Sequence, residues 1–456
     1  MSPLDSLTTA VTGMSAQATA LANISDNVAN SQTVGFKAVN TTFADYVTQA
    51  AAEGAGQSSV VAQQQYTNDE QGSITQVSSP TSLAISGQGY FAVAQPASSS
   101  NGVTMFSSQP YYTRVGDFET DKSGYLINSS GYALEGWAAS STASGVNFNT
   151  STLAPIQISK APSEPVATSN ISFSGNLPST PSTDTVSNPY GSTIQVFDKE
   201  GNAQSVNLSW SQVGQTNPTG PISSSNPAVP NEWNLTVTGG NPSQTSGPML
   251  VTFGSTSADA GTIQSIAAPA SAGTLAVSPP SQSGTGAAAT ITLPLNFGLG
   301  TQSVALNLGT FGSTSGMTQF AGTSYQITSQ SQDGAAQGNF SSVTIKPTGD
   351  VVINYDNGTT NTIARIPLAN FNNPNGLIEH DGQTFSPTSD SGSANVESAG
   401  TGGAGTMVVG SVESSNVDIA TQFTSMIVAQ RAYTANSKII TTANEMMQDT
   451  LNMVQG

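Results

Sequence analysis

Cysteine is absent from this chain of 456 residues, and histidine occurs once, as His380. Without cysteine the chain can form no disulfide and no thiolate-ligated metal site, and one histidine cannot complete a zinc site by itself. The first twenty residues lack a basic segment and a continuous apolar core, so we expect no secretory signal peptide. No run approaches the roughly 18 apolar residues that cross a bilayer. The sequence therefore argues against a disulfide scaffold, a thiolate metalloprotein and membrane insertion.

Charge of either sign is also scarce. Charged residues make up 8% of the chain, whereas an ordinary soluble domain has about 25%. Nine residues are Lys or Arg and 27 are Asp or Glu, which gives a net charge of −18, and Lys199 is the only basic residue between positions 161 and 345. Nucleic acids and anionic membrane surfaces are bound by clustered Lys and Arg. We therefore expect neither of them as a partner.

Motifs for catalysis are almost as rare. The segment GTGGAG at 400–405 has the spacing of a dinucleotide-binding loop, but no strong strand precedes it and TMVV follows it in place of a helix. We interpret it as a flexible joint before the C-terminal helix. His380 lies between Glu379 and Asp381 without a nucleophile motif, and we interpret it as part of a solvated turn. A pair of distant carboxylates stays open, but we predict no catalytic, cofactor-binding or metal-binding residue and no cofactor.

Glycine, in contrast, is abundant, with 45 residues, and Ser, Thr, Asn and Gln are frequent. This composition is typical of β-structure with many turns and neutral polar faces. Stretches such as STIQVFDKEGNAQSVNLSW and VTIKPTGDVVINYDNGTTNTIARI alternate apolar and polar residues around the turn signals DKEGN and DNG. The middle of the chain is therefore predicted to be mainly antiparallel β.

The N-terminus follows a helical period. Ser2 can cap a helix and Pro3 suits its first position. Apolar residues then recur at alternating spacings of three and four until the pattern ends near Asn30, which describes a narrow seam. The residues of this seam are Leu4, Leu7, Val11, Met14, Ala18, Leu21 and Val28.

The C-terminus repeats the pattern over a longer stretch. Ser415 and Asp418 resemble a capping box, and a helix over 416–455 would be about 60 Å long. Apolar residues recur every seven positions, at Ile419, Met426, Tyr433, Ile440, Met447 and Val454. The stripe is widened by Phe423, Ala429, Ala443 and Leu451.

A narrow apolar seam needs a second helix against which to pack. The chain's other terminus is one candidate, and an intramolecular coiled coil stays open as an alternative. The neutral, small residues beside the seams favour contact with further helices, so we interpret both termini as assembly elements. The predicted fold class is α+β: long N- and C-terminal helices form a paired, coiled-coil assembly domain, and mainly antiparallel β domains are inserted between them.

Shifts in composition suggest the segment boundaries. We expect an N-terminal helix of the inner assembly domain over 1–30, an inter-domain connector over 31–70, a β-domain over 71–170 and 318–410, an inserted outer β-domain over 171–317, and a C-terminal helix of the assembly domain over 411–456.

Several stretches are similar to one protein family. The N-terminal helix ends in ANISDNVANSQTVGFKA, TSLAISGQGYFAV precedes YYTRVGDFETDKSGYLINSSGYALEGW, and the chain closes with ESSNVDIATQFTSMIVAQRAYTANSKIITTANEMMQDTLNMV. Together they resemble the axial proteins of the bacterial flagellum, the rod and hook family. The middle stretch STIQVFDKEGNAQSVNLSW resembles the extra domain of the hook members. The resemblance covers about two-thirds of the chain, and 205–317 is weakly constrained.

The resemblance implies a function. It implies a structural subunit, not an enzyme, that self-assembles into the flagellar hook, a curved tube that acts as a universal joint and transmits motor torque from rod to filament. It also implies an extracellular location in the flagellar hook and basal body, export without a cleaved signal peptide, and a homopolymer whose partners are the distal rod protein, the hook cap protein, the hook–filament junction protein and the flagellar export apparatus. A distal rod or junction protein of the same family is the nearest alternative, and a secreted β-rich adhesin or enzyme is the alternative from another class.

The resemblance also assigns a role to the connector motif, whose residues are Ala29, Asn30, Gly35, Phe36 and Lys37. Asn30 and Gly35 tolerate a positive φ, so we expect them to end the helix. We expect Phe36 to anchor the turn toward the β-domains by packing, and Lys37 to meet a carboxylate of a neighbouring subunit. The segment 31–70 as a whole is expected to contact adjacent subunits. An ordinary helix end with a buried Phe36 is the simpler alternative.

Overall fold

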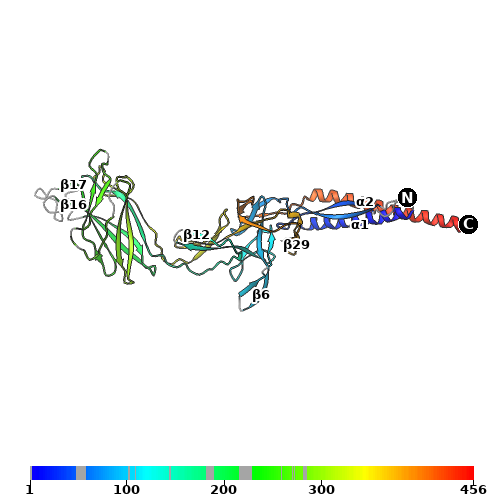
Figure 1. Cartoon of the computed structure of the whole chain (residues 1–456), viewed down its shortest axis with the longest axis horizontal. Helices are drawn as coiled ribbons and strands as arrows, with labels where there is room; N and C mark the ends of the chain where they lie inside the picture. The colour runs from blue at the N-terminus through cyan, green and yellow to red at the C-terminus, as the bar shows by residue number, and fades with distance from the viewer. Residues whose placement is uncertain are drawn as a thin grey trace. The chain divides into compact units, whose positions relative to one another are not determined.

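The chain folds into two compact units that share its length unequally. The computed structural model describes residues 3–47, 58–100, 103–107, 109–142, 145–180, 189–214, 228–257, 259–269, 271, 273–280 and 285–455. Unit 1 comprises Met1–Lys160, Ser341–Asn354 and Thr360–Gly456, and unit 2 comprises Ala161–Phe340 with Tyr355–Thr359. Helices at both ends of the chain flank β-structure (Figure 1), which confirms the predicted arrangement of helix and strand along the sequence.

The terminal helices are α1 (Pro3–Ala29) and α2 (Ile419–Gln455), which lie side by side in unit 1 (Figure 1). The Asn27 Nδ2 atom donates to Gln422 Oε1 at 3.3 Å, and a Cβ added to Gly13 would lie 2.8 Å from Asn436 Nδ2. In both pairs the residue numbers sum to 449, so the helices are antiparallel and keep one register. This register places Pro3 level with Met446, and the last turns of α2 continue beyond that level.

The start of α2 differs from the predicted capping box. The Thr421 N–H donates to Asp418 Oδ1 at 2.9 Å, and this hydrogen bond lowers the pKa of the Asp418 carboxyl. Ser415 Oγ instead accepts a hydrogen bond from the Val417 N–H at 3.3 Å. Because α2 begins at Ile419, Asp418 is its N-cap, and a carboxylate there satisfies a backbone donor that the helix leaves free.

A two-stranded ribbon lies along α1. Strands β1 (Val39–Val47) and β2 (Ser58–Tyr66) pair antiparallel, with Val39 opposite Tyr66. Side-chain amides of α1 hold the first strand: Asn23 Nδ2 donates to Thr41 Oγ1 at 2.8 Å. Asn27 both accepts from the Val39 N–H and donates to the Val39 carbonyl, at 2.9 Å each. The side-chain amides of Asn23 and Asn27 therefore attach β1 to this face of α1.

The main sheet belongs to unit 1 except for the end residues of two strands at its border. Its strands run in the order β25 (Phe340–Ile345), β26 (Asp350–Tyr355), β27 (Thr360–Arg365), β11 (Ala133–Thr142), β5 (Tyr90–Ala94), β8 (Tyr111–Thr113), β30 (Thr384–Ser386) and β29 (Ile378–His380). Six further strands belong to this sheet but lie off this path, namely β9 (Glu119–Thr120), β10 (Leu126–Ile127), β12 (Gly145–Phe148), β13 (Ala154–Pro155), β28 (Pro367–Asn370) and β31 (Asn395–Ser398). A 3₁₀ turn, η1 (Pro374–Gly376), lies between β28 and β29.

Two short strand pairs join the beginning of unit 1 to its end. They are β3 (Ile74–Gln76) with β33 (Ser411–Glu413) and β4 (Leu83–Ser86) with β32 (Thr406–Val409). A local pair is formed by β6 (Pro96–Ser100) and β7 (Val103–Phe106). The predicted joint at 400–405 is therefore not directly before the C-terminal helix. It is a turn between β31 and β32, because TMVV pairs with the apolar strand LAIS, with Met407 opposite Ile85.

Unit 2 is built from β-strands around one core. One sheet has the order β15 (Tyr190–Phe197), β16 (Ala203–Gly214), β17 (Ala228–Gly239), β19 (Met249–Phe253) and β20 (Ile263–Ile266), with β18 (Gln244–Thr245) on β17. The other has the order β21 (Ala288–Asn296), β22 (Thr301–Thr310), β14 (Asn170–Asn176) and β23 (Met317–Thr318), with β24 (Gln326–Gln332) on β14.

Both sheets of unit 2 contribute to a single apolar cluster, which includes Trp210 and Trp233 from one sheet and Ile291 and Leu306 from the other. Alternate residues of the strands point into this cluster, as period-two patterning requires. One shared core means that the two sheets form one folding unit. Since β14 and β24 belong to it, the unit extends on both sides of the segment 171–317 that we expected.

Candidate assembly interface

The face of α1 that packs within the chain is made of small and amide residues. The predicted seam borders this face: Leu7, Met14, Leu21 and Val28 are half-buried, Val11 and Ala18 are exposed, and the Leu4 side chain lies outside the description. The buried residues of α1 are Ala10, Ala16, Ala20, Asn23, Ile24 and Asn27. The larger apolar side chains of α1 are thus only partly used by contacts inside one chain.

The same division holds for α2. Its buried residues are Gln422, Ala429 and Ala443. Of the predicted stripe, Met426, Ile440 and Met447 are half-buried and the Val454 side chain lies outside the description. Four predicted residues are 40–58% exposed, namely Ile419, Phe423, Tyr433 and Leu451. Five apolar residues that the sequence pattern missed are 46–76% exposed, namely Ile427, Val428, Ile439, Met446 and Met453.

Small residues at the contact explain this division. The register places Ala20 of α1 opposite Ala429 of α2, and Gly13 beside Asn436. Residues without long side chains let two helices approach closely, and a close approach moves the larger side chains to the outer flanks. The helix pair therefore presents Phe423, Ile427 and similar residues to its surroundings.

An apolar groove lies where α1, β1 and α2 meet. It has a volume of about 420 Å³, and its lining includes Ile24, Phe43, Val428 and Ala429. Phe43 and Val428 are 48% and 63% exposed. Exposed apolar residues gathered over several elements indicate an interaction surface, whereas single exposed apolar residues do not.

The connector after α1 is held by backbone contacts. Ala29 is the last residue of α1, and both the backbone and the side-chain amide of Asn30 donate to the Asp26 carbonyl at 3.0 Å. The helix ends directly before Asn30, as expected, but Asn30 does not have the positive φ that we expected: its side-chain amide caps the helix end instead. Gly35 has φ +73°, its N–H donates to the Glu413 carbonyl at 2.8 Å, and an added Cβ would lie 2.9 Å from the Val115 nitrogen. Only glycine fits there.

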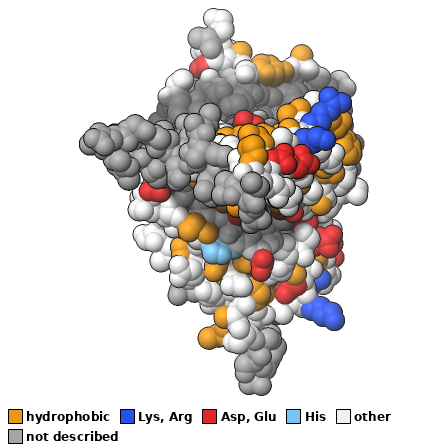
Figure 2. All heavy atoms as spheres, turned by 90° about the vertical axis from the view of Figure 1, so that its right-hand side faces the viewer, with side chains coloured by type: hydrophobic (Ala, Val, Ile, Leu, Met, Phe, Trp, Pro, Cys, Tyr) orange, Lys and Arg blue, Asp and Glu red, His pale blue; other side chains and the backbone are white. Residues whose placement is uncertain are grey.

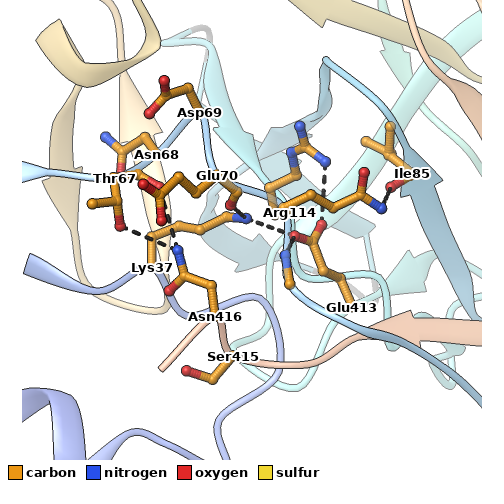
Figure 3. Close-up of polar contacts among 12 residues, drawn as sticks. Lys37, Thr67, Asn68, Asp69, Glu70, Ile85, Arg114, Glu413, Ser415 and Asn416 are labelled. Carbon is orange, nitrogen blue, oxygen red and sulfur yellow. Dashed lines mark hydrogen bonds and ion pairs between the residues drawn. The ribbon is translucent and has the colours of Figure 1, made fainter. Parts of the chain in front are cut away.

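Directly after Gly35, the chain enters a buried ion cluster (Figure 3). Lys37 Nζ lies 2.6 Å from Glu413 Oε1, and Arg114 Nη1 lies 3.2 Å from Glu413 Oε2. The side chains of Lys37, Arg114 and Glu413 are at most 3% exposed. Glu413 Oε1 also accepts from the Gly72 N–H at 2.8 Å, and Lys37 donates to the Glu70 carbonyl at 2.5 Å. The cluster thus joins the segment after α1, the loop after β8 and the strand before α2.

Comparisons with known proteins match the whole length of the chain. Flagellar hook protein FlgE of Brucella suis biovar 1 is 33% identical over 99% of this chain and all of its own length, and that of Escherichia coli K12 is 30% identical over 97% of this chain and 98% of its own length. The chain belongs to the flagellar hook protein family. The solved structure of Helicobacter pylori flagellar hook protein FlgE2 covers 73% of this chain and 98% of its own, at 13% identity and a TM-score of 0.46.

Family descriptions also match in segments along this hook-family chain. The flagella basal body rod protein family matches 7–37, the flagellar hook protein FlgE/F/G D1 domain matches 84–176, the flagellar basal body protein FlaE D2 domain matches 167–335, and the flagellar basal body rod FlgEFG protein C-terminal family matches 408–453. The first match includes most of α1 with the connector motif, and the last includes nearly all of α2. Both helices are therefore covered by family matches of their own.

The ion cluster has an unbalanced charge, with two cations around one carboxylate. Burial lowers the pKa of the Lys37 ammonium from its ordinary value; Glu413 opposes this shift and the positive Arg114 adds to it. The Arg114 guanidinium lies 5.1 Å from the Tyr90 ring centre, and burial raises the pKa of Tyr90 to about 12. Tyr90 donates its hydroxyl proton to the Asn68 carbonyl at 2.8 Å. A low-dielectric site of this kind makes each ion pair depend strongly on its partner.

The cluster corrects one expectation and adds two residues. We expected Lys37 to meet a carboxylate of a neighbouring subunit, but its partner is Glu413 of the same chain, and a buried ammonium has no access to another subunit. The sequence analysis did not single out Arg114 or Glu413. The scarcity of basic residues was a usable signal, because the chain has only nine Lys and Arg residues. A Lys or an Arg within an apolar, glycine-rich stretch of such a chain favours a specific carboxylate partner.

The single histidine lies on a strand and not in a turn as we expected. His380 is the last residue of β29, its Nε2 lies 2.8 Å from Ser386 Oγ, and its ring meets the edge of Tyr111. Among the described residues there is no group of three or more His, Cys, Asp or Glu side chains that could hold a metal ion. The same part of the chain contains no helix long and apolar enough to cross a membrane.

Proposed function

We propose that this chain is the structural subunit of the flagellar hook and that α1 and α2 form its paired, coiled-coil assembly domain. Copies polymerise when the exposed flanks of these helices pack against other copies. The observation that carries the proposal is the helix pair itself, which packs through alanine and leaves Phe423, Ile427 and Leu451 more than half exposed. The full-length similarity to flagellar hook proteins supports it.

The division between helices and β-units suits a curved tube that must bend while it turns. Interdigitated apolar side chains resist sliding, because a shift separates close-packed atoms. The surface of unit 2 offers mainly uncharged polar groups, with Lys199 the only basic residue between 161 and 345. Hydrogen bonds between such groups contribute about 0.5–1.5 kcal/mol each and exchange readily for others. The helices form the fixed inner layer of the hook, and the β-domains make exchangeable contacts.

The ion cluster couples the two layers. Lys37 follows α1 and pairs with Glu413, which precedes α2, and Glu413 also pairs with Arg114 of the β-domain. Torque applied to the helices therefore reaches the β-domain through buried contacts of the same subunit. The segment 31–70, which contains the β1–β2 ribbon, provides further contacts to adjacent subunits in this proposal.

The remaining partners follow from the same role. The hook joins the distal rod protein to the hook–filament junction protein, grows beneath the hook cap protein, and receives its subunits from the flagellar export apparatus without signal-peptide cleavage. The location is extracellular, in the flagellar hook. The role is structural, so no substrate and no cofactor are required.

Electron microscopy of the full-length protein tests the proposal. Under polymerising conditions we expect tubes of uniform diameter, and we expect Met426→Asp and Ile440→Asp to abolish them, because assembly would bury an unpaired charge. Lys122→Asp, at an exposed position outside the helices, is the matched control and should assemble. A wild-type protein that stays monomeric at high concentration would overturn the proposal.

A further inference from the structure

The charged residues of α2 form a stripe with two ends of opposite sign. Arg431, Lys438 and Glu445 follow one another at intervals of seven, and Asp449 lies one turn after Glu445. All four side chains are exposed. The ion pairs among the described residues are Lys37–Glu413, Arg114–Glu413 and Arg365–Asp350. None of the four stripe residues takes part in them. The stripe thus has a basic half and an acidic half, and neither half has an ion-pair partner in the described part of its own chain.

The stripe faces away from α1. The buried residues Gln422, Ala429 and Ala443 mark the side of α2 that contacts α1, and an offset of two residues, about 200° around a helix, places Arg431 and Glu445 on the opposite side. Asp449 lies beyond the level of Pro3, where the described part of α1 has ended. Figure 2 looks at the end of the chain where α1 and α2 lie, and it shows basic, acidic and apolar side chains exposed close together.

The basic half also has the shape of a docking site. A shallow depression on α2 is lined by Gln430, Arg431, Thr434, Ala435 and Lys438. The small side chains of Thr434 and Ala435 lie between the two long basic ones, so another helix can come close there. A carboxylate on that helix can then reach a guanidinium or an ammonium.

We propose that the basic half of this stripe binds the acidic half of α2 in a second copy of this chain, with the two α2 helices parallel and displaced along their axes. The centres of the two halves are about 12.5 residues apart, so the displacement is about 19 Å. The contact sets the axial stagger between neighbouring copies, which the apolar flanks alone do not specify. This inference rests on the proposed function, because it deepens the helix contact assigned there.

The parallel arrangement follows from symmetry. An antiparallel pair about the middle of the stripe would also match opposite charges, but it uses the same patch on both copies and closes into a dimer. A parallel, displaced pair uses two different patches, so each pair keeps one unoccupied basic half and one unoccupied acidic half to which further copies can bind. Only this second type of contact continues into an open polymer.

Charge reversal tests the inference on the full-length protein. The variant Arg431→Glu/Lys438→Glu has an acidic stripe throughout, and Glu445→Lys/Asp449→Lys has a basic one. We expect each alone to raise the critical concentration for tube formation by at least about tenfold, because like charges then face each other. A one-to-one mixture of the two should assemble near the wild-type concentration. Mixed tubes support the parallel contact, whereas mixed dimers that do not elongate would overturn it.

The four-fold variant, with both halves reversed, sharpens the test. It should form tubes by itself, yet it should not copolymerise with the wild type, because every mixed contact places like charges together. Lys122→Glu/Lys160→Glu changes the net charge by the same amount as the acidic variant at exposed positions outside α2, and it should assemble as the wild type does. If both double variants assemble normally while the wild type forms tubes, this inference fails and the proposed function stands. If the wild type forms no tubes, the proposed function itself fails.

Discussion

Unit 2 and the helix pair of unit 1 use their apolar residues in opposite ways. In unit 2, alternating strands send aliphatic and aromatic side chains into one core, where Trp210 and Trp233 are fully buried. In the helix pair, alanines fill the contact, and Phe423 and Ile427 remain 51% and 52% exposed. Full burial of a large apolar side chain contributes about 1.5–3 kcal/mol, which these helices obtain only in part. We infer that unit 2 is complete in one copy, whereas the helix pair is completed by other copies.

The largest effect on the free chain is expected within the ion cluster of unit 1. Glu413→Ala leaves the buried Lys37 and Arg114 without their shared carboxylate, which should cost about 3–5 kcal/mol of unit 1 stability. Hydrogen exchange measured peptide by peptide will separate strands of unit 1 from those of unit 2. Glu119→Ala, at an exposed position, is the control and should change neither unit. Equal destabilisation of both units by Glu413→Ala would contradict the assignment of the cluster to unit 1.

A similar loss is expected in unit 2 without any effect on the helices. Leu208 is fully buried in the core of unit 2, so Leu208→Ala should lower the stability of that unit by about 2–5 kcal/mol. Leu299→Ala, at a residue that is 42% exposed, should change it by less than about 0.5 kcal/mol. Exchange rates in α2 should be the same in both variants. Faster exchange in α2 after Leu208→Ala would show that the two regions do not fold independently.

The pH dependence of unit 1 provides a smaller effect. Burial raises the pKa of Tyr90 from 10.0 to about 12. Because the folded form holds this proton more tightly than the unfolded form, the contribution is fully present below pH 10 and is lost as the pH rises through 12. Relative to Tyr90→Phe, the wild type should lose about 2–3 kcal/mol of unit 1 stability between pH 9 and pH 12. Parallel stability curves for the two proteins would show that Tyr90 does not titrate as proposed.

Phe423→Asp should have the smallest effect on the stability of the free chain and yet abolish assembly. Phe423→Asp replaces an exposed residue of α2, so the free energy of unfolding of the single chain should change by less than about 0.5 kcal/mol. Tube formation should stop, because contact with another copy would bury the new charge. Met105→Asp alters another exposed apolar residue, on β7, and should leave assembly intact. Tubes formed by Phe423→Asp would remove this residue from the interface.

The sequence predicted the order of elements because periodicity records which side of each element is buried. Periods of seven and two in the sequence correspond to α2 and to strands such as β15 and β16. Periodicity does not say which contact buries a stripe. In α1, the residues packed within the chain are Ala16, Ala20 and Asn23, next to the predicted seam, because small residues allow the close approach of α2 and the ribbon.

The ion cluster was beyond prediction for a different reason. Lys37, Arg114 and Glu413 are far apart in the sequence and lie together in a fold where β3 pairs with β33 and β4 with β32. A local pattern contains no information on such long-range pairing. The turn at Gly35, which is local, was expected as a site of positive φ, and the structure adds why: its nitrogen donates to the carbonyl of Glu413.

Amide hydrogen exchange of α2, compared between the free chain and assembled tubes, tests the central claim most directly. The account predicts fast exchange over residues 419–455 in the free chain, slow exchange over β16 in both states, and strong protection of α2 only in tubes. A free monomer in which α2 is already as protected as β16 would contradict it.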